Sequence, residues 1–366
     1  MTIAILATGD EIIHGDTLNT NAHVIAKALS SEGLPLGLHL TCSDKEKELN
    51  DSIRFLLEHH TIILSIGGLG PTSDDRTRFA FARTLGLDLV EYPEALEHIQ
   101  ARLNRASLPF DSGNRLQALF PAHSTLLPNS NGTAMGCIFS AQEKLFILLP
   151  GPPSECLQMF DNSVLPYLQK MQHSHKQLLS WQLFGVAEGQ VAEQLEKALL
   201  GIDCSTGYRL DMPYLEFKVR CEALTAEQVK QIVDPLVASY IISPPKRKAS
   251  QLLREQLVLM NKSVSIIDRA TGGVLETLLR RPENAAFLSF YDKKGSDFYC
   301  EITGIDAYWE SDNSSTRTEL VMKYHNQKSS GEERHSIPYR GHSHVLGYAA
   351  EWLSFRILKI MNSIFD

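Results

Sequence analysis

The sequence predicts an α/β protein whose N-terminal domain has three layers, a parallel sheet with helices on both faces. Short apolar runs at 3–7, 34–41 and 62–64 alternate with stretches in which apolar side chains recur at helical spacing. Polar, glycine-rich turns follow the first and third runs. This order is typical of βαβ units, whose strands lie parallel and whose ligands bind beyond the carboxyl ends of the strands.

The turn at 65–77 is the main candidate for a ligand site. It reads S-I-G-G-L-G-P-T-S-D-D-R-T and leads from the apolar run at 62–64 into a helix expected at 79–85. Its glycines, which permit tight geometry and close approach of a ligand to backbone N–H groups, are Gly67, Gly68 and Gly70. Asp74 and Asp75 would cap the helix or hold a divalent cation. A plain strand-to-helix turn is the alternative, although these residues exceed what turning needs.

The turn after the first apolar run carries a second group of polar residues. Gly9, Asp10 and Glu11 lie just past the carboxyl end of that strand. Thr20 or Asn21 would cap the helix that follows. The short polar residues of this turn either serve only as cap and turn residues or join the ligand site; they are Asp16, Asn19 and Asn21. We favour a shared site, because both turns follow strands of one expected sheet.

Further polar residues lie between 113 and 155. Asn114, Arg115 and Gln117 either contact a polar ligand or face water. The apolar run at 145–149 predicts a buried strand. Glu155 begins the next helix, where the positive end of the helix dipole favours a carboxylate. Its position alone does not decide whether Glu155 is also a ligand group.

The composition is that of an ordinary globular chain, with 43% hydrophobic and 21% charged residues. The formal net charge of -8 lacks the basic signature of a nucleic-acid binder. No apolar run reaches membrane-spanning length, and the N-terminus lacks the basic region of a signal peptide. The six cysteines are scattered without a C-x-x-C pair, which favours reduced thiols. We therefore expect a cytoplasmic protein without membrane or nucleic-acid partners.

Four motifs, at 9–21, 67–77, 128–136 and 149–155, carry a family resemblance. They read G-D-E-I-x-x-G-x-x-x-N-x-N, G-G-L-G-P-T-x-D-D-x-T, P-N-x-x-G-T-A-x-G and L-P-G-P-P-S-E. Together they resemble the N-terminal domain of the competence/damage-inducible (CinA) family, over residues 1–170. That domain is similar to the molybdopterin-binding fold of MoaB and Mog proteins. The resemblance implies nucleotide or pterin binding and, as in some members, metal-dependent hydrolysis of the ADP-ribose pyrophosphate.

The resemblance also implies a role for each matching residue. The backbone of 67–70 would cradle a phosphate, and Asp74 and Asp75 would be catalytic and hold magnesium, manganese or cobalt. The other ligand-binding residues would line or close the same pocket; they are Gly9, Asp10, Glu11, Asn19, Thr72, Asn131, Gly132 and Thr133. Similar proteins form dimers, so a homodimer is expected. No separate general base is identifiable.

Residues 171–246 form a second expected domain. Strands at 178–184, 205–210 and 215–221, with a helix after the first and after the last, resemble the KH-type linker domain of the same family. RNA binding by a KH domain needs a G-x-x-G loop with basic neighbours, whereas 185–189 reads G-V-A-E-G and is acidic. We expect this domain to be a spacer or a dimer contact.

Residues 247–366 resemble the C-terminal domain of the family, an α/β domain that in active members deamidates nicotinamide mononucleotide. The active sequence is A-E-S-C-T-G-G, with the serine as reactive group, whereas 267–273 reads I-D-R-A-T-G-G here. Thr271, Gly272 and Gly273 are retained, but Arg269 stands in place of the serine. Because an arginine is always protonated, it is not a nucleophile. We expect a degenerate domain that folds without deamidating.

Three smaller expectations concern the C-terminal half. The polar stretch at 314–331 is expected to be a loop, and 345–361 to be an amphipathic helix. The tryptophans are expected in hydrophobic cores rather than as stacking platforms; they are Trp181, Trp309 and Trp352.

Two functions of different classes follow. The first is a metal-dependent pyrophosphatase of the ADP-ribose type in the N-terminal domain, with the deamidase activity lost. The second is a non-catalytic protein that holds a pterin or nucleotide, or a scaffold linked to competence or the DNA-damage response. The sequence does not name the substrate, because ADP-ribose, FAD, NADH and a pterin all offer phosphate and a flat ring.

Overall fold

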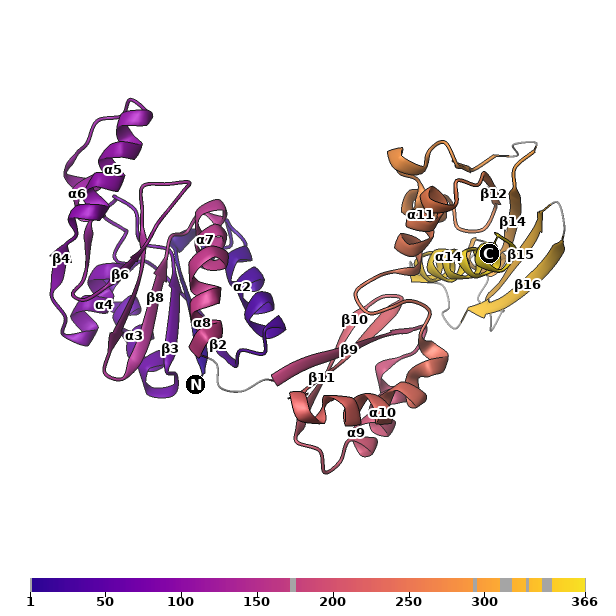
Figure 1. Cartoon of the computed structure of the whole chain (residues 1–366), viewed down its shortest axis with the longest axis horizontal. Helices are drawn as coiled ribbons and strands as arrows, with labels where there is room; N and C mark the ends of the chain where they lie inside the picture. The colour runs from indigo at the N-terminus through magenta and orange to yellow at the C-terminus, as the bar shows by residue number, and fades with distance from the viewer. Residues whose placement is uncertain are drawn as a thin grey trace. The chain divides into compact units, whose positions relative to one another are not determined.

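The computed structural model describes residues 2–171, 176–291, 295–309, 318–326, 329–337 and 344–365. The chain forms two compact units, Met1–Leu178 and Leu179–Asp366, and Figure 1 labels many of their helices and strands. Within the described ranges, no helix is both long and apolar enough to cross a membrane.

The first unit contains a six-stranded sheet of order β2-β1-β3-β8-β7-β6 (Figure 1). Its parallel strands are β1 (Ile3–Thr8), β2 (Leu36–Cys42), β3 (Ile62–Ile66) and β8 (Lys144–Leu149). The expected parallel sheet is confirmed, and antiparallel pairing occurs at one edge, at β6 (Thr125–Leu127) and β7 (Gly136–Ala141). The reason is a two-residue turn with positive φ, Gln142-Glu143, which joins β7 directly to β8.

Helices cover both faces of this sheet, as predicted. In β1, Ala4 and Leu6 belong to one buried cluster, whereas Ile3 and Ile5 belong to another on the opposite face. The helices are α1 (Asp10–Ile13), α2 (Thr20–Ser31), α3 (Glu46–His59), α4 (Thr77–Leu85), α5 (Pro93–Arg105), α6 (Ser112–Leu116), α7 (Pro153–Met159) and α8 (Leu165–Met171), with a π-helical turn at Phe160–Val164. A small ribbon pairs β4 (Leu89–Glu91) with β5 (Leu119–Pro121).

The second unit begins with a three-stranded sheet of order β10-β11-β9, against which two helices pack. Its elements are β9 (Lys176–Phe184), α9 (Glu188–Ala198), β10 (Cys204–Asp211), β11 (Tyr214–Glu222) and α10 (Ala226–Val237), with 3-10 turns at Ala223–Thr225 and Ala238–Tyr240. The order strand-helix-strand-strand-helix agrees with the sequence pattern. Trp181 and Phe217 pack together in its core.

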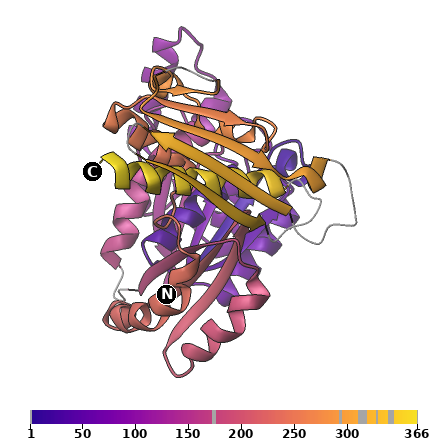
Figure 2. The ribbon, with the colours of Figure 1, turned by 90° about the vertical axis from the view of Figure 1, so that its right-hand side faces the viewer.

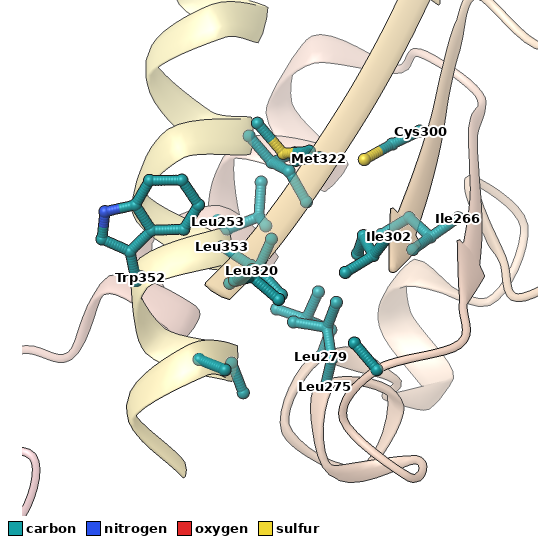
Figure 3. Packing of buried hydrophobic residues seen from close by; sticks show 14 of the residues in the cluster. Leu253, Ile266, Leu275, Leu279, Cys300, Ile302, Leu320, Met322, Trp352 and Leu353 are labelled. Atoms are coloured by element: carbon teal, nitrogen blue, oxygen red, sulfur yellow. The ribbon is translucent and has the colours of Figure 1, made fainter. Parts of the chain in front are cut away.

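The rest of this unit is a five-stranded sheet of order β13-β12-β14-β15-β16, with helices packed against it (Figure 2). Its elements are α11 (Ala249–Met260), β12 (Val264–Asp268), α12 (Val274–Leu279), a 3-10 turn (Pro282–Asn284), β13 (Leu288–Ser289), β14 (Phe298–Gly304), α13 (Asp306–Trp309), β15 (Thr318–Asn326), β16 (Ser330–Ile337) and α14 (His344–Phe365). Leu253 of α11, Leu353 of α14 and Leu320 of β15 meet in the core (Figure 3).

Two expectations for this region were wrong. The stretch at 314–331 is not a loop throughout, because β15 occupies Thr318–Asn326 and β16 begins at Ser330; residues 314–317 and 327–328 lie outside the described ranges. Trp309 is 51% exposed rather than buried, whereas Trp181 and Trp352 are buried as expected. The predicted C-terminal helix is confirmed by α14.

A buried carboxylate links the three-stranded sheet of the second unit to two helices that pack against its five-stranded sheet. Glu351 of α14 accepts hydrogen bonds from the Tyr214 hydroxyl at 2.8 Å and from the Ser250 backbone N–H at 3.1 Å. Its other oxygen accepts from the Ser250 hydroxyl at 2.6 Å. Phe184 of β9 also stacks on Tyr348 of α14, with ring centroids 4.4 Å apart. Each oxygen of this buried carboxylate accepts a hydrogen bond, so its burial leaves no polar atom without a partner.

Candidate functional site

A pocket of about 380 Å³ lies at the carboxyl ends of the parallel strands of the first unit. Its walls come from the turns after β1, β2, β3 and β8. The residues that line it are Thr8, Gly9, Glu11, Asp44, Gly67, Gly68, Leu69, Gly70, Pro71, Asp74, Asp75, Gln117, Thr133, Ala134, Pro150, Gly151, Pro152 and Glu155. The two turns that the sequence analysis placed at one site therefore do share a pocket.

The glycine-rich turn is shaped mainly by contacts within the protein. Gly67 and Gly68 have φ angles of 104° and 67°, in the region that favours glycine. A Cβ atom on Gly68 would collide with the side chain of Thr77. The N–H of Gly67 donates to the Leu149 carbonyl at 2.9 Å and is not available to a ligand. The tight backbone geometry expected of these glycines is confirmed, but it serves the packing of the turn against the rest of the protein.

Within 67–70, the backbone N–H groups of Gly68 and Leu69 have no acceptor in the described part of the chain. The N–H of Gly70 is occupied, because it donates to the Asp75 carboxylate at 2.7 Å. Any phosphate cradle therefore has fewer available N–H groups than the sequence suggested. It consists of the N–H groups of Gly68 and Leu69, whose residues line the pocket.

Asp75 and Asp74 differ in their surroundings. Asp75 accepts hydrogen bonds from the N–H groups of Gly70 and Thr72, at 2.7 and 2.9 Å, and from the Thr72 hydroxyl. Asp74 is exposed, and the nearby Thr72 hydroxyl holds the pKa of its carboxyl below the ordinary value. The expectation that either carboxylate caps the following helix was wrong, because Arg76 is the N-cap residue of α4 and no side chain caps it.

Carboxylates dominate the lining of the pocket. Five of its residues are acidic and none is lysine, arginine or histidine; the acidic residues are Glu11, Asp44, Asp74, Asp75 and Glu155. Burial, followed by the nearby charges of Asp10, Glu11 and Asp74, raises the pKa of Asp44, although a hydrogen bond from the Asp10 N–H partly opposes the rise. An anion alone would be repelled from such a pocket, whereas a cation would be attracted.

Several expected ligand residues frame the pocket without lining it. Asn19, rather than Thr20 or Asn21, caps α2, since its side chain accepts from the Ala22 N–H at 3.2 Å. Asn131 donates to the Ser154 carbonyl at 2.7 Å. The members of this framing set are Asp10, Asn19, Thr72, Asn131 and Gly132; the expected residues that do line the pocket are Gly9, Glu11, Gly67, Gly68, Gly70, Asp74, Asp75 and Thr133.

Comparison with known proteins settles the family. Residues 4–170 match the family described as "Probable molybdopterin binding domain". A competence-damage inducible protein from Caldanaerobacter subterraneus subsp. tengcongensis is 31% identical over 277 residues, which cover 74% of this chain and 67% of that protein. The chain belongs to the competence-damage inducible (CinA) family.

Two solved structures resemble part of the CinA-family chain. The protein CinA from Thermoplasma acidophilum, described as of unknown function, is 31% identical with a TM-score of 0.42, covering 46% of this chain and 97% of that one. The molybdopterin biosynthesis enzyme MoaB from Thermus thermophilus is 20% identical with a TM-score of 0.31, covering 46% of this chain and 94% of that one.

Two polar pocket residues of this CinA-family chain were not expected from its sequence, and the roles of two others, Gln117 and Glu155, were left open. Asp44 follows β2, at the same edge of the sheet as the recognised turns, and the strand order could have revealed it. Thr8 hydrogen-bonds Thr77 through their hydroxyls at 3.2 Å and supports the glycine-rich turn. Gln117, one of three polar residues considered earlier, is buried and lines the pocket.

The second unit of the CinA-family chain contains the altered T-G-G loop. Asp268 accepts from the N–H groups of Ala270 and Thr271, at 3.0 and 2.8 Å, and from the Thr271 hydroxyl. Trp309 lies over Gly272, where a Cβ atom would collide with the indole ring. Its indole N–H donates to the Ala270 carbonyl at 2.8 Å. Arg269 pairs with Glu301 at 3.4 Å, and Gly273 precedes α12 in the left-handed conformation.

The donor set of the first unit suits a hard divalent cation. Carboxylate oxygens are the ligands that magnesium and manganese prefer, and magnesium often takes only one or two carboxylates together with substrate phosphates and waters. Within the described ranges, no group of three or more His, Cys, Asp or Glu side chains is already gathered to hold a metal.

Proposed function

We propose that the first unit is a metal-dependent nucleotide pyrophosphatase of the ADP-ribose type. The observation that carries the proposal is the pocket lining, which combines five carboxylates, no basic side chain and two free backbone N–H groups. A pyrophosphate enters such a site only when its negative charge is offset. Asp74 and Asp44 would hold magnesium, manganese or cobalt, and Asp75 would keep the turn in shape.

Some residues of the pocket would bind the phosphate, and others would orient the ligand. The N–H groups of Gly68 and Leu69 would bind an oxygen of one phosphate. A divalent cation, when bound, would neutralise phosphate oxygens and lower the pKa of a coordinated water. Glu155 is held by the Asn129 side chain, whose amide donates to it at 2.7 Å, and would orient polar groups of the ligand.

An assay of AMP release from ADP-ribose tests this proposal through two variants. Asp74→Asn should abolish metal-dependent release, because it removes the exposed carboxylate. Glu58→Gln, on the exposed side of α3, removes the same charge away from the pocket and should leave release unchanged. Equal activity of wild type and Asp74→Asn would contradict the assignment.

A non-catalytic ligand-binding protein is the second candidate. The observation that favours it is that the described residues contain no preassembled metal-binding group of three or more side chains. A pterin or nucleotide would then occupy the pocket without turnover, and the protein would act as a binder or scaffold. Ligand binding without any release of AMP would favour this candidate.

For the second unit, we propose that deamidation of nicotinamide mononucleotide is lost. Arg269 offers no nucleophile in place of the serine of active relatives, and Trp309 covers the retained glycine. We also propose a homodimer, which sedimentation velocity of the full chain would test.

A further inference from the structure

A buried guanidinium lies directly behind the glycine-rich turn. Arg78, in the first turn of α4, is 0% exposed. It donates to the Gln117 carbonyl at 2.9 Å and to the Gly70 carbonyl at 3.1 Å, and both of these residues line the pocket. Its Nε atom has no hydrogen-bond partner in the described part of the chain. Arg78 therefore touches the pocket wall from its inner side.

This side chain keeps its charge in the protein interior. Burial lowers the pKa of Arg78 to about 10, so the guanidinium is protonated at neutral pH. Its hydrogen-bond acceptors among the described residues are backbone carbonyls, and the Phe120 ring lies 5.6 Å from it. The Asp75 carboxylate, which favours the charged form, is already committed to the turn. The positive charge is thus only partly offset by the protein.

The lining of the pocket contains no basic side chain. A charge in a dry interior is screened much less than one at the surface, so the field of Arg78 reaches the pocket through the residues that it contacts. The positive field of Arg78 would act in opposite directions on two kinds of ligand. A phosphate would be attracted, and a divalent cation would be repelled.

We propose that Arg78 is a positioning residue that holds Gly70 in place and supplies the buried positive charge by which the pocket binds a nucleotide phosphate. This inference rests on the proposed function of the same pocket. It assigns phosphate affinity partly to a buried side chain that does not line the pocket. A purely structural Arg78 would affect both ligands in the same direction, which distinguishes the two roles.

Two substitutions separate the charge from the hydrogen bonds. Arg78→Gln keeps an amide donor for a carbonyl but removes the charge, whereas Arg78→Lys keeps the charge with fewer donors. Arg83→Gln is the matched control, because Arg83 lies on the same helix, is exposed and pairs with Glu46. Circular dichroism of each full-length variant verifies that it is folded.

The measurement is the dissociation constant of each variant for two separate probes, AMP by calorimetry in saturating Mg²⁺ and Mn²⁺ without nucleotide by electron paramagnetic resonance. Arg78→Gln should bind AMP about tenfold more weakly and Mn²⁺ about threefold more tightly. Arg78→Lys should stay within about threefold of wild type for both probes, and Arg83→Gln should match wild type.

Opposite shifts for the two probes in Arg78→Gln would support the inference. Unchanged constants, or a parallel loss of both, would overturn it while leaving the proposed function intact. If Arg78→Gln does not fold, a folded Arg78→Lys decides: retained AMP binding supports the role of charge, and a loss above about tenfold overturns it. Wild type that binds neither probe would refute the proposed function, and the inference with it.

Discussion

Asp75 and Arg78 hold the same residue, Gly70, at its two ends. The Asp75 carboxylate accepts the Gly70 N–H at 2.7 Å, and the Arg78 guanidinium donates to the Gly70 carbonyl at 3.1 Å. Asp75 lies near the end of the turn and Arg78 in the first turn of α4, so the turn is held by residues that follow Gly70 in the sequence. The free N–H groups of Gly68 and Leu69 are therefore positioned before any ligand arrives.

Asp75→Asn should destabilise the folded protein, whereas Asp74→Asn should leave its stability nearly unchanged. Asp75→Asn weakens the hydrogen bonds that Gly70 and Thr72 donate, and should cost about 1–2 kcal/mol of unfolding free energy. Asp74→Asn should leave the unfolding free energy within about 0.5 kcal/mol of wild type, because Asp74 is exposed. Urea denaturation of both variants measures this. A larger loss for Asp74→Asn than for Asp75→Asn would contradict the assigned roles.

Asp44→Asn should stabilise the metal-free protein. Burial and neighbouring carboxylates raise the pKa of Asp44, so the folded state holds this proton more tightly than the unfolded chain does. The resulting stabilisation is present below the ordinary value of 3.8 and is lost as pH rises through the folded pKa. At pH 7 in chelator, Asp44→Asn should therefore raise Tm by about 1–3 °C.

A divalent cation should stabilise Asp44→Asn less than it stabilises the wild type. Mn²⁺ should raise the Tm of wild type more than that of Asp44→Asn, because a cation relieves the repulsion among the carboxylates. A thermal melt at pH 7 with and without Mn²⁺ measures both effects. An Asp44→Asn protein that is less stable than wild type in chelator would be inconsistent with carboxylate crowding.

The position of the pocket could be predicted from the sequence. The apolar runs of β1 and β3 are each followed by a polar turn, and parallel strands bring their carboxyl ends to one edge. The same rule applies to Asp44 after β2, although the turn that contains Asp44 has no glycine-rich motif. The alternation of buried Leu320 and Met322 with exposed Glu319 and Lys323 was also readable as a strand, but its polar flanks suggested a loop.

Other features depend on contacts that no local pattern records. Asp75 reaches back to Gly70 rather than forward to the helix, because the turn folds over its carboxylate. Arg78 follows the motif directly, yet only the fold places it beneath Gly70 instead of in solvent. Trp309 covers Gly272, where the missing side chain leaves room for an indole, instead of entering a core.

The second unit should lose stability at alkaline pH through Tyr214. Burial and the Glu351 charge raise the pKa of Tyr214 well above the ordinary value of 10.0. The folded state therefore favours the protonated hydroxyl, and its stabilisation is present below pH 10 and lost as pH rises further. Between about pH 9 and pH 11, wild type should lose unfolding free energy more steeply than Tyr214→Phe. Equal slopes in chemical denaturation would argue against this.

Ammonia release from nicotinamide mononucleotide should not exceed background. The wild type lacks a nucleophile at Arg269, and Trp309→Ala should remain inactive although it uncovers Gly272. A coupled assay for ammonia measures both proteins. Release above background that disappears in Thr271→Ala would show that the altered loop still deamidates.

The most direct test of the central claim is AMP release from ADP-ribose by the wild-type protein, measured with Mn²⁺ or Mg²⁺ and again with excess chelator. The proposed function predicts release that requires the metal and returns when metal is added back. No release with either metal, although ADP-ribose binds, would contradict a pyrophosphatase and leave the pocket as a binding site.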